Sequence, residues 1–157
     1  MMYKYFKPNA YAHEDEPMSG ALDHFKTTFN QLNANTLNLL DEIYTPDVVF
    51  RDPVHKLEGL PALRDYYGRL YAGVVSCQFE FESEVVDGPQ AMLVWIMRFQ
   101  HRRFRRGEML DLRGVSHLQF RDDGKAGHHH DYFDMGAFIY ERVHLLGSVI
   151  RMIKRQL

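Results

Sequence analysis

Apolar residues in the first half of the chain recur with the 3–4 spacing of amphipathic helices. Ser19 can cap a helix that an Asn-Ala-Asn stretch at 33–35 would end. The apolar stripe of this helix has steps of 3, 4 and 3 and consists of Leu22, Phe25, Phe29 and Leu32. We predict a second, short helix over 37–44 and a third that starts at Gly59 and Pro61.

The second half of the chain has the period of two that is typical of strands. A brief β-branched stretch at 48–50 predicts a first strand, closed by Pro53. Phe79 and Phe81 then alternate with glutamates, as in a strand with one exposed face. Three further strands are predicted over 91–103, 109–121 and 125–134, after a hairpin turn at Asp87-Gly88. Helices followed by a meander of strands predict an α+β fold: a curved mixed or antiparallel β-sheet wrapped as a cone around three N-terminal helices.

The length of 157 residues corresponds to one domain. We assign residues 1–18 to an N-terminal tail and residues 19–157 to the domain. Within the domain, residues 136–157 are predicted to form a C-terminal helix. Its apolar stripe repeats with steps of 4 and 3 from Ile139 to Leu157, so it can pack on the core or cover the mouth of the cone.

Charge and composition exclude several classes of protein. A nucleic-acid or anionic-membrane binder would need a basic excess, whereas 19 basic and 21 acidic side chains give a net charge of −2. The basic run at 102–106 lies at a predicted hairpin tip, where charges are usually solvated. No apolar run reaches the roughly 20 residues of a membrane span, and the single Cys77 suits a reducing compartment, so we expect a cytoplasmic protein. An aromatic share of 13% supplies rings that can line a cavity.

Three segments carry a resemblance to a known superfamily. They are YTPDVVFRDP at 44–53, LRDYY at 63–67 and HDYFD at 130–134. Over roughly residues 20–136 the chain resembles the nuclear transport factor 2-like (cystatin-like) superfamily. Within it, the chain is similar to the SnoaL-like branch, to ketosteroid isomerases and to limonene epoxide hydrolases. The resemblance implies a cone with an internal pocket but selects no reaction, because this fold carries isomerases, hydrolases, cyclases and non-catalytic binders.

Asp52 is the first candidate for acid–base chemistry. It follows a short apolar strand and is held by Pro53, so we expect it to point into the cone, where burial would raise its pKa toward neutrality. The resemblance to ketosteroid isomerases implies a proton-shuttling role for this Asp-Pro motif. Their oxyanion donors fall on Thr28 and Ser116 here, so steroid isomerisation is not expected. The alternative is that Asp52 only brackets the turn into the third helix.

Asp131 is the second candidate. Strand alternation places His129, Asp131 and Phe133 on one face of the last strand. The resemblance to epoxide hydrolases implies that Asp131 activates water and that Arg98 is retained, whereas Gln100 stands where that family has an acid. Because an amide cannot protonate an opening epoxide, that mechanism is incomplete unless Asp52 supplies the carboxylate. An Arg98–Asp131 pair would lie at the base of the cavity or simply tie the strands together.

The run His128-His129-His130-Asp131 invites a metal interpretation, to which His55 and His117 could contribute. Four consecutive strand residues cannot all reach one ion, and the chain has no helical His pair at i, i+4. We therefore expect no metal and no cofactor, and we interpret His129 as a polar group of the cavity.

The strand 91–103 is apolar on both faces. If Val94, Ile96 and Arg98 line the cone, large side chains cover the outer face of the sheet. A homodimer is the simplest cover for such a patch, which consists of Trp95, Met97 and Phe99.

Two functions remain open at this stage. The first is a cofactor-independent acid–base enzyme of the SnoaL-like kind, acting on a small hydrophobic molecule as an isomerase, hydrolase or cyclase. The second is a non-catalytic ligand-binding or dimeric assembly module of the same fold. In the enzyme, Asp52 and Asp131 are the catalytic carboxylates, and Arg98, Gln100 and His129 orient ligand, water or carboxylate. The expected walls of the ligand site are Phe50, Tyr67, Ser116, Leu118 and Phe133.

Overall fold

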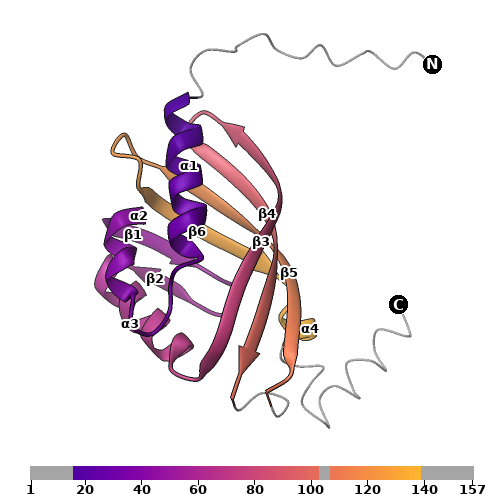
Figure 1. Ribbon diagram of the computed structural model, residues 1–157. Helices are drawn as coiled ribbons and strands as arrows, with labels where there is room; N and C mark the ends of the chain where they lie inside the picture. The colour runs from indigo at the N-terminus through magenta and orange to yellow at the C-terminus, as the bar shows by residue number, and fades with distance from the viewer. Residues whose placement is uncertain (1–15, 103–106, 139–157) are drawn as a thin grey trace, which may run out of the picture.

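The computed structural model describes residues 16–102 and 107–138 (Figure 1). Most of the predicted tail, most of the predicted helix 136–157 and residues 103–106 of the basic run lie outside these residues. Along the chain the elements are α1 (Glu16–Phe29), a 3₁₀ turn (Leu37–Leu39), α2 (Leu40–Ile43), β1 (Tyr44–Arg51), β2 (Lys56–Glu58), α3 (Leu60–Tyr71), β3 (Val74–Asp87), β4 (Gln90–His101), β5 (Met109–Phe120), β6 (Ala126–Phe133) and α4 (Met135–Phe138).

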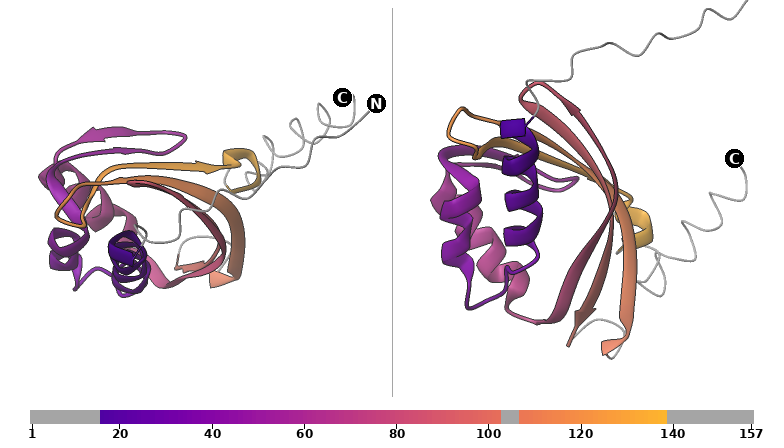
Figure 2. Two further views of the ribbon diagram at one scale, coloured as in Figure 1. Left: turned by 90° about the horizontal axis from the view of Figure 1, so that it is seen from above. Right: turned by 45° about the horizontal axis from the view of Figure 1, so that its top comes forward.

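The strands form one six-stranded sheet in the order β2-β1-β6-β5-β4-β3. The β1–β6 pair is parallel and every other pair is antiparallel, so the sheet is mixed. The sheet bends strongly and the helices lie on its concave side, without closure into a barrel (Figure 2). This arrangement confirms the predicted α+β class and the curved sheet around three helices.

The helices form where the apolar spacing predicts them. The predicted stripe of α1 is buried: Leu22, Phe25 and Phe29 pack into the core against Tyr44 and Phe120. The helix begins at Glu16, three residues before the predicted cap. Because the pattern at 48–50 showed only part of β1, the sequence prediction was too short there, and the three-residue β2 was missed.

The assignment of the two faces of β4 was wrong. Trp95 and Phe99, with 3% and 5% of their surface exposed, point to the concave side together with Met97. Val94, Ile96 and the exposed Arg98 lie on the opposite face of the strand. Large rings fill the space between sheet and helices better than β-branched side chains. Trp95, Met97 and Phe99 are therefore part of the interior. They do not form the outer patch that was predicted as a dimer interface.

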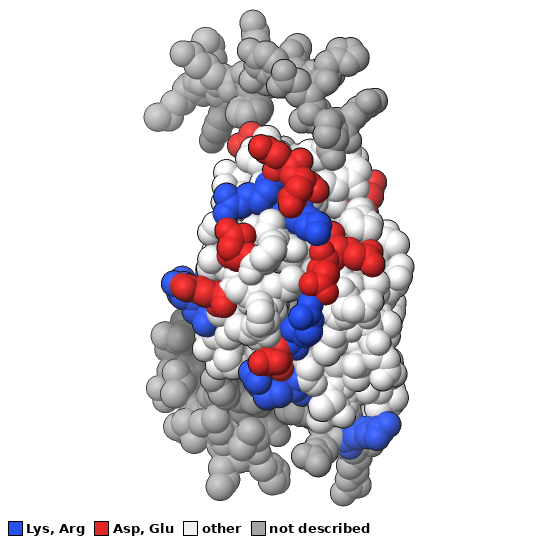
Figure 3. Space-filling model, turned by 90° about the vertical axis from the view of Figure 1, so that its left-hand side faces the viewer, with Lys and Arg blue, Asp and Glu red and all other residues white. Residues whose placement is uncertain are grey.

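The side of the molecule that carries α2 and α3 has charges of both signs interspersed (Figure 3). Several are paired: Lys26 lies 2.7 Å from both Asp23 and Glu84, and Arg64 lies 2.6 Å from Asp41. No single sign of charge dominates this face. Among the described residues, no helix is long and apolar enough to cross a membrane.

Candidate functional site

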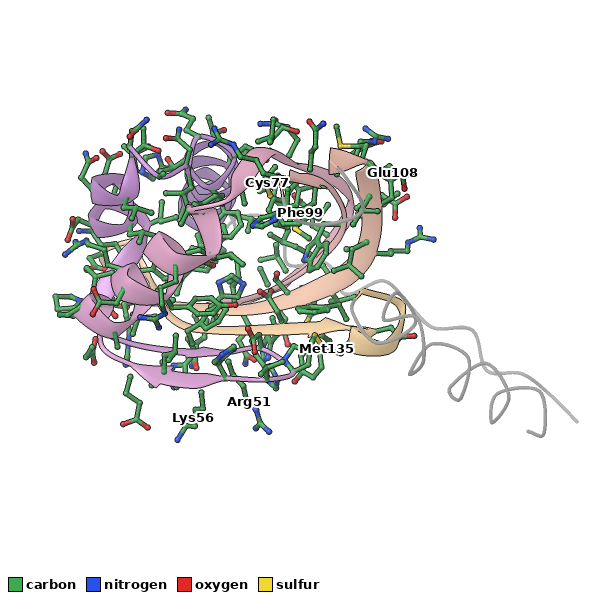
Figure 4. All side chains as sticks on the ribbon, turned by 90° about the horizontal axis from the view of Figure 1, so that it is seen from below. Arg51, Lys56, Cys77, Phe99, Glu108 and Met135 are labelled. Atoms are coloured by element: carbon green, nitrogen blue, oxygen red, sulfur yellow. The ribbon has the colours of Figure 1, made fainter. Side chains whose placement is uncertain are left out.

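The concave face of the sheet and α3 enclose a cavity of about 80 Å³. This is several times the ~10–15 Å³ that one water molecule needs and well below the roughly 300 Å³ of pockets for drug-sized ligands. In Figure 4, Cys77 and Phe99 point into this space, whereas Arg51 and Lys56 point away from it. Most of the wall is aromatic and consists of Phe29, Phe50, Tyr66, Tyr67, Tyr71, Phe79, Trp95, Phe99 and Phe133.

Asp131, on β6, lines the cavity and is the end point of a chain of hydrogen bonds. Its Oδ1 lies 2.5 Å from the Ser116 hydroxyl and 2.8 Å from Nε2 of His129. The Ser116 oxygen in turn accepts a hydrogen bond of 2.9 Å from the Trp95 indole N–H. Among the described residues, every hydrogen bond to Asp131 ends on Oδ1. The other carboxylate oxygen, Oδ2, takes no hydrogen bond from these residues.

The partners of His129 determine which ring nitrogen carries the proton. Asp131 can only accept, so the neutral imidazole must carry its hydrogen on Nε2. Its Nδ1 then accepts the hydrogen bond from the Tyr44 hydroxyl, 2.6 Å away. Burial, with the Asp131 charge adding to it, raises the pKa of Tyr44 well above its ordinary value, so this hydroxyl stays a donor. All the hydrogen bonds of the cluster thus point toward the carboxylate.

Packing holds the His129 ring in place. The side chain is only 2% exposed. The Phe50 ring meets it edge-on at 5.1 Å between centroids, and the Phe25 ring does so at 5.8 Å. The Tyr44 ring stacks on it at 5.9 Å. Such a ring cannot rotate freely, which suits a residue that positions a carboxylate.

Asp52 also lines the cavity, directly after β1, and it is 6% exposed. Its Oδ1 accepts the backbone N–H groups of Val54 and His55 at 2.7 and 2.6 Å. Its Oδ2 accepts the Tyr66 hydroxyl at 2.6 Å, and the His55 ring lies 3.3 Å from both oxygens. Asp52 therefore brackets the turn that follows β1, as the alternative interpretation predicted, and it also lines the cavity.

The expected rise in the pKa of Asp52 is wrong in sign. Burial alone would raise it, but the hydrogen bonds from Tyr66, Val54 and His55 favour the charged form and together lower the pKa below its ordinary value. Asp52 is therefore a fixed negative charge at neutral pH and a weak base.

Replacing Asp52 with Asn should lower the free energy of unfolding by about 1–2 kcal/mol at neutral pH, because donors bind a charged acceptor more strongly than an amide. The folded-state pKa is depressed, so the stabilisation is present above the unfolded pKa of about 3.9. It is lost as the pH falls through the folded-state pKa. Urea unfolding of both proteins between neutral pH and about pH 2.5 should show the two stabilities converging. A gap that stays constant down to the lowest pH would contradict this account.

Three of the predicted catalytic residues do not line the cavity: His129, which is buried, Arg98 and Gln100. Arg98 is on the convex face of β4 and pairs with Glu80 at 2.8 Å, so the proposed Arg98–Asp131 pair does not form. Gln100 donates to the backbone oxygen of Gly107 at 2.7 Å and is not part of the cavity wall. Arg98 and Gln100 were predicted to line the cavity because the two faces of β4 were assigned the wrong way round. The epoxide hydrolase arrangement is accordingly absent from the cavity wall.

Three of the five residues predicted to form the walls of the ligand site line the cavity. Phe50, Tyr67 and Phe133 line the cavity. Leu118 is fully buried in the hydrophobic core instead. Ser116 is buried behind Asp131, which it holds by a hydrogen bond.

Sequence reasoning missed three polar partners in this region: Tyr44, Tyr66 and the Trp95 indole. The pairing of the strands could have identified Trp95 as a partner of Ser116. Ser116 is opposite Asp131 and also opposite Leu93, next to Trp95 on the inward face of β4. Tyr44 and Tyr66 could not be found in this way, because Tyr44 reaches His129 and Tyr66 reaches Asp52 from segments that are remote in sequence.

Cys77 lines the cavity but is unsuited to nucleophilic catalysis. Burial raises the pKa of its thiol to about 12, against which a hydrogen bond with Tyr71 acts only in part. The thiol is therefore uncharged at neutral pH. In the described part of the chain no group of three or more His, Cys, Asp or Glu side chains is arranged to hold a metal ion.

The family comparison agrees with this architecture. A family model for the SnoaL-like domain matches residues 25–129. No curated protein matches the chain in sequence.

Solved structures of the same fold share little sequence with the chain. A nuclear transport factor 2-like protein of unknown function from Burkholderia pseudomallei has a TM-score of 0.68 at 14% identity, covering 79% of this chain and 95% of its own. A putative SnoaL-like polyketide cyclase from Shewanella denitrificans has a TM-score of 0.66 at 18% identity, with 78% and 94% covered. A hypothetical protein with a ketosteroid isomerase-like fold from Catenulispora acidiphila, in complex with trimethylamine, has a TM-score of 0.65 at 11% identity, with 80% and 92% covered. At such identities the similarity shows the fold alone.

Proposed function

Because this chain belongs to the SnoaL-like domain family, we propose that it is a cofactor-independent acid–base enzyme acting on a compact, mainly apolar molecule. Asp131 is the proton acceptor, and His129 and Ser116 are positioning residues. The observation that carries the proposal is the asymmetry of the Asp131 carboxylate. Its Oδ1 takes both hydrogen bonds and its Oδ2 takes none from the described residues, while the side chain lines the cavity.

The cavity can support proton abstraction from a carbon next to a carbonyl group. The proton passes to Oδ2 of Asp131, the C–H electron pair forms the double bond of an enolate, and the carbonyl π pair moves to oxygen. In an isomerisation the proton returns to another carbon of the conjugated system. In a cyclisation the enolate carbon bonds to a second carbonyl carbon, and the new alkoxide takes the proton back. Neither route needs an oxidant or a reductant.

The surroundings of Asp131 favour this chemistry. Apolar walls exclude water, which strengthens each electrostatic interaction inside the cavity. His129 and Ser116 hold the carboxylate in one orientation, so little reorganisation is needed at the moment of proton transfer. Two features of similar proteins support the proposal: one is a putative polyketide cyclase, and another holds a ligand as compact as trimethylamine.

Deuterium exchange tests the proposal. The protein is incubated in heavy water with small ketones such as cyclopentanone and 2-cyclohexenone, and proton NMR follows loss of the α-hydrogens. We expect exchange that increases with protein concentration and saturates with ketone. If ketones bind but exchange no faster than in buffer, the result would favour the non-catalytic binding module. Two observations support that alternative: Asp52 is held by several hydrogen bonds, and the cavity is small.

A further inference from the structure

Within the part of the chain that the structure describes, the cavity wall contains two carboxylates and no lysine or arginine. The carboxylates are those of Asp52 and Asp131. Arg98 is held by its ion pair on the convex face, and the Arg51 side chain points away from the cavity (Figure 4). Hydrogen bonds stabilise both carboxylates but do not cancel their negative charge. The interior therefore has an excess of negative charge.

This excess is greatest when the neighbouring imidazoles are neutral. His55 is the titratable ring beside Asp52, and His129 is the one beside Asp131. Three hydroxyl-bearing rings on α3 also line the cavity, but burial raises the pKa of Tyr66, Tyr67 and Tyr71, so they stay uncharged. Among the described residues, no lysine or arginine in the wall offsets the carboxylates.

Aromatic rings complete the complementarity to a cation. The Tyr66 ring lies 5.4 Å from that of Tyr67 and 5.5 Å from that of Phe50, and Trp95 belongs to the same wall. The faces of such rings carry partial negative charge and attract ammonium groups, indole most strongly. The volume of about 80 Å³ restricts the ligand to a few heavy atoms around the charge.

We propose that this cavity selects a compact organic cation of the alkylammonium class, placed between the carboxylates and the ring faces. The inference deepens the proposed function by naming the charge of its substrate, and it rests on the same cavity. An enolate forming beside the fixed charge of Asp52 would be repelled by it. An ammonium group on the substrate would offset that repulsion.

Trp95 is the chain's single tryptophan and lines the cavity, so its fluorescence reports occupancy directly. At pH 8 and constant ionic strength, the protein is titrated with tetramethylammonium, with tert-butanol as a neutral analogue of similar size, and with pivalate as an anion. We expect saturable binding of tetramethylammonium at least about tenfold tighter than that of tert-butanol, and none of pivalate. Equal or tighter binding of tert-butanol, or binding of neither, would overturn the inference.

Matched variants locate the charge that is recognised. Asp52→Asn should weaken tetramethylammonium binding about tenfold and leave tert-butanol unaffected. Glu58→Gln removes the same charge from an exposed position on β2 outside the cavity wall and should change neither. If both variants weakened tetramethylammonium binding equally, the cation would be responding to the overall charge of the protein and not to a specific site. Cation binding without ketone exchange would contradict only the proposed enzymatic function. Exchange of neutral ketones without cation binding would contradict only the inference that the cavity selects a cation.

Discussion

Replacing Asp131 with Asn is expected to lower the rate of ketone deuterium exchange by about 10²–10⁴-fold, the usual contribution of a general base. The amide has nearly the shape of the carboxylate and can still accept the hydrogen bonds of Ser116 and His129 through its oxygen. It cannot take a proton from carbon. The melting temperature should therefore change by only a few degrees while the rate collapses.

The control for this variant is Asp111→Asn. Asp111 is an exposed carboxylate on β5 that does not line the cavity, so its replacement should leave the exchange rate unchanged. Measuring both variants at saturating ketone separates the chemical step from binding. If Asp131→Asn exchanged as fast as the original protein, Asp131 would not be the base.

Replacing Phe25 with Ala is expected to lower the free energy of unfolding by about 3–5 kcal/mol. The ring is buried at the meeting point of helix α1 and the sheet. Its neighbours within aromatic contact are Phe29, Tyr44, Phe120 and His129. The vacancy would remove dispersion contacts from all of them and free the His129 ring to move.

Urea unfolding measures the cost, and Val85→Ala provides the reference. Val85 is a 67% exposed apolar side chain on β3, so its truncation should stay within about 0.5 kcal/mol. The exchange rate of Phe25→Ala should also fall, because a mobile His129 no longer fixes Asp131. A loss below about 1 kcal/mol would show that the neighbouring rings collapse into the space.

Much of the fold could be read from periodicity. The inward face of β6 was predicted because alternation is strict along a strand, so one aromatic ring, Phe133, places Asp131 and His129 beside it. The stripe of α1 was predicted because its helical spacing leaves only one apolar face. Where one face is apolar and the other polar, the pattern is sufficient.

β4 shows where this reasoning fails. Both of its faces are apolar, so alternation defines two sets of residues without saying which one faces inward. Only the volume to be filled between sheet and helices decides that Trp95 points in and Arg98 points out. The predicted roles of Arg98 and Gln100 failed with this single choice.

The charge state of Asp52 depends on contacts that no local pattern contains. Burial was predicted correctly, and on its own it would raise the pKa. The opposing hydrogen bond comes from Tyr66, 14 residues further on in α3, and from two backbone N–H groups of the turn. The sign of the shift is decided by these donors, and their direction appears only in the folded chain.

The hydrogen-bond chain through His129 runs from the Tyr44 hydroxyl to Oδ1 of Asp131. Nitrogen-15 NMR of the imidazole at pH 8, assigned by comparison with His129→Gln, tests it without any substrate. We expect a proton on Nε2 and a bare Nδ1 that accepts the hydrogen bond from Tyr44. A proton on Nδ1 would contradict this expectation, because Asp131 would then lose the Nε2–H donor that holds its carboxylate in place.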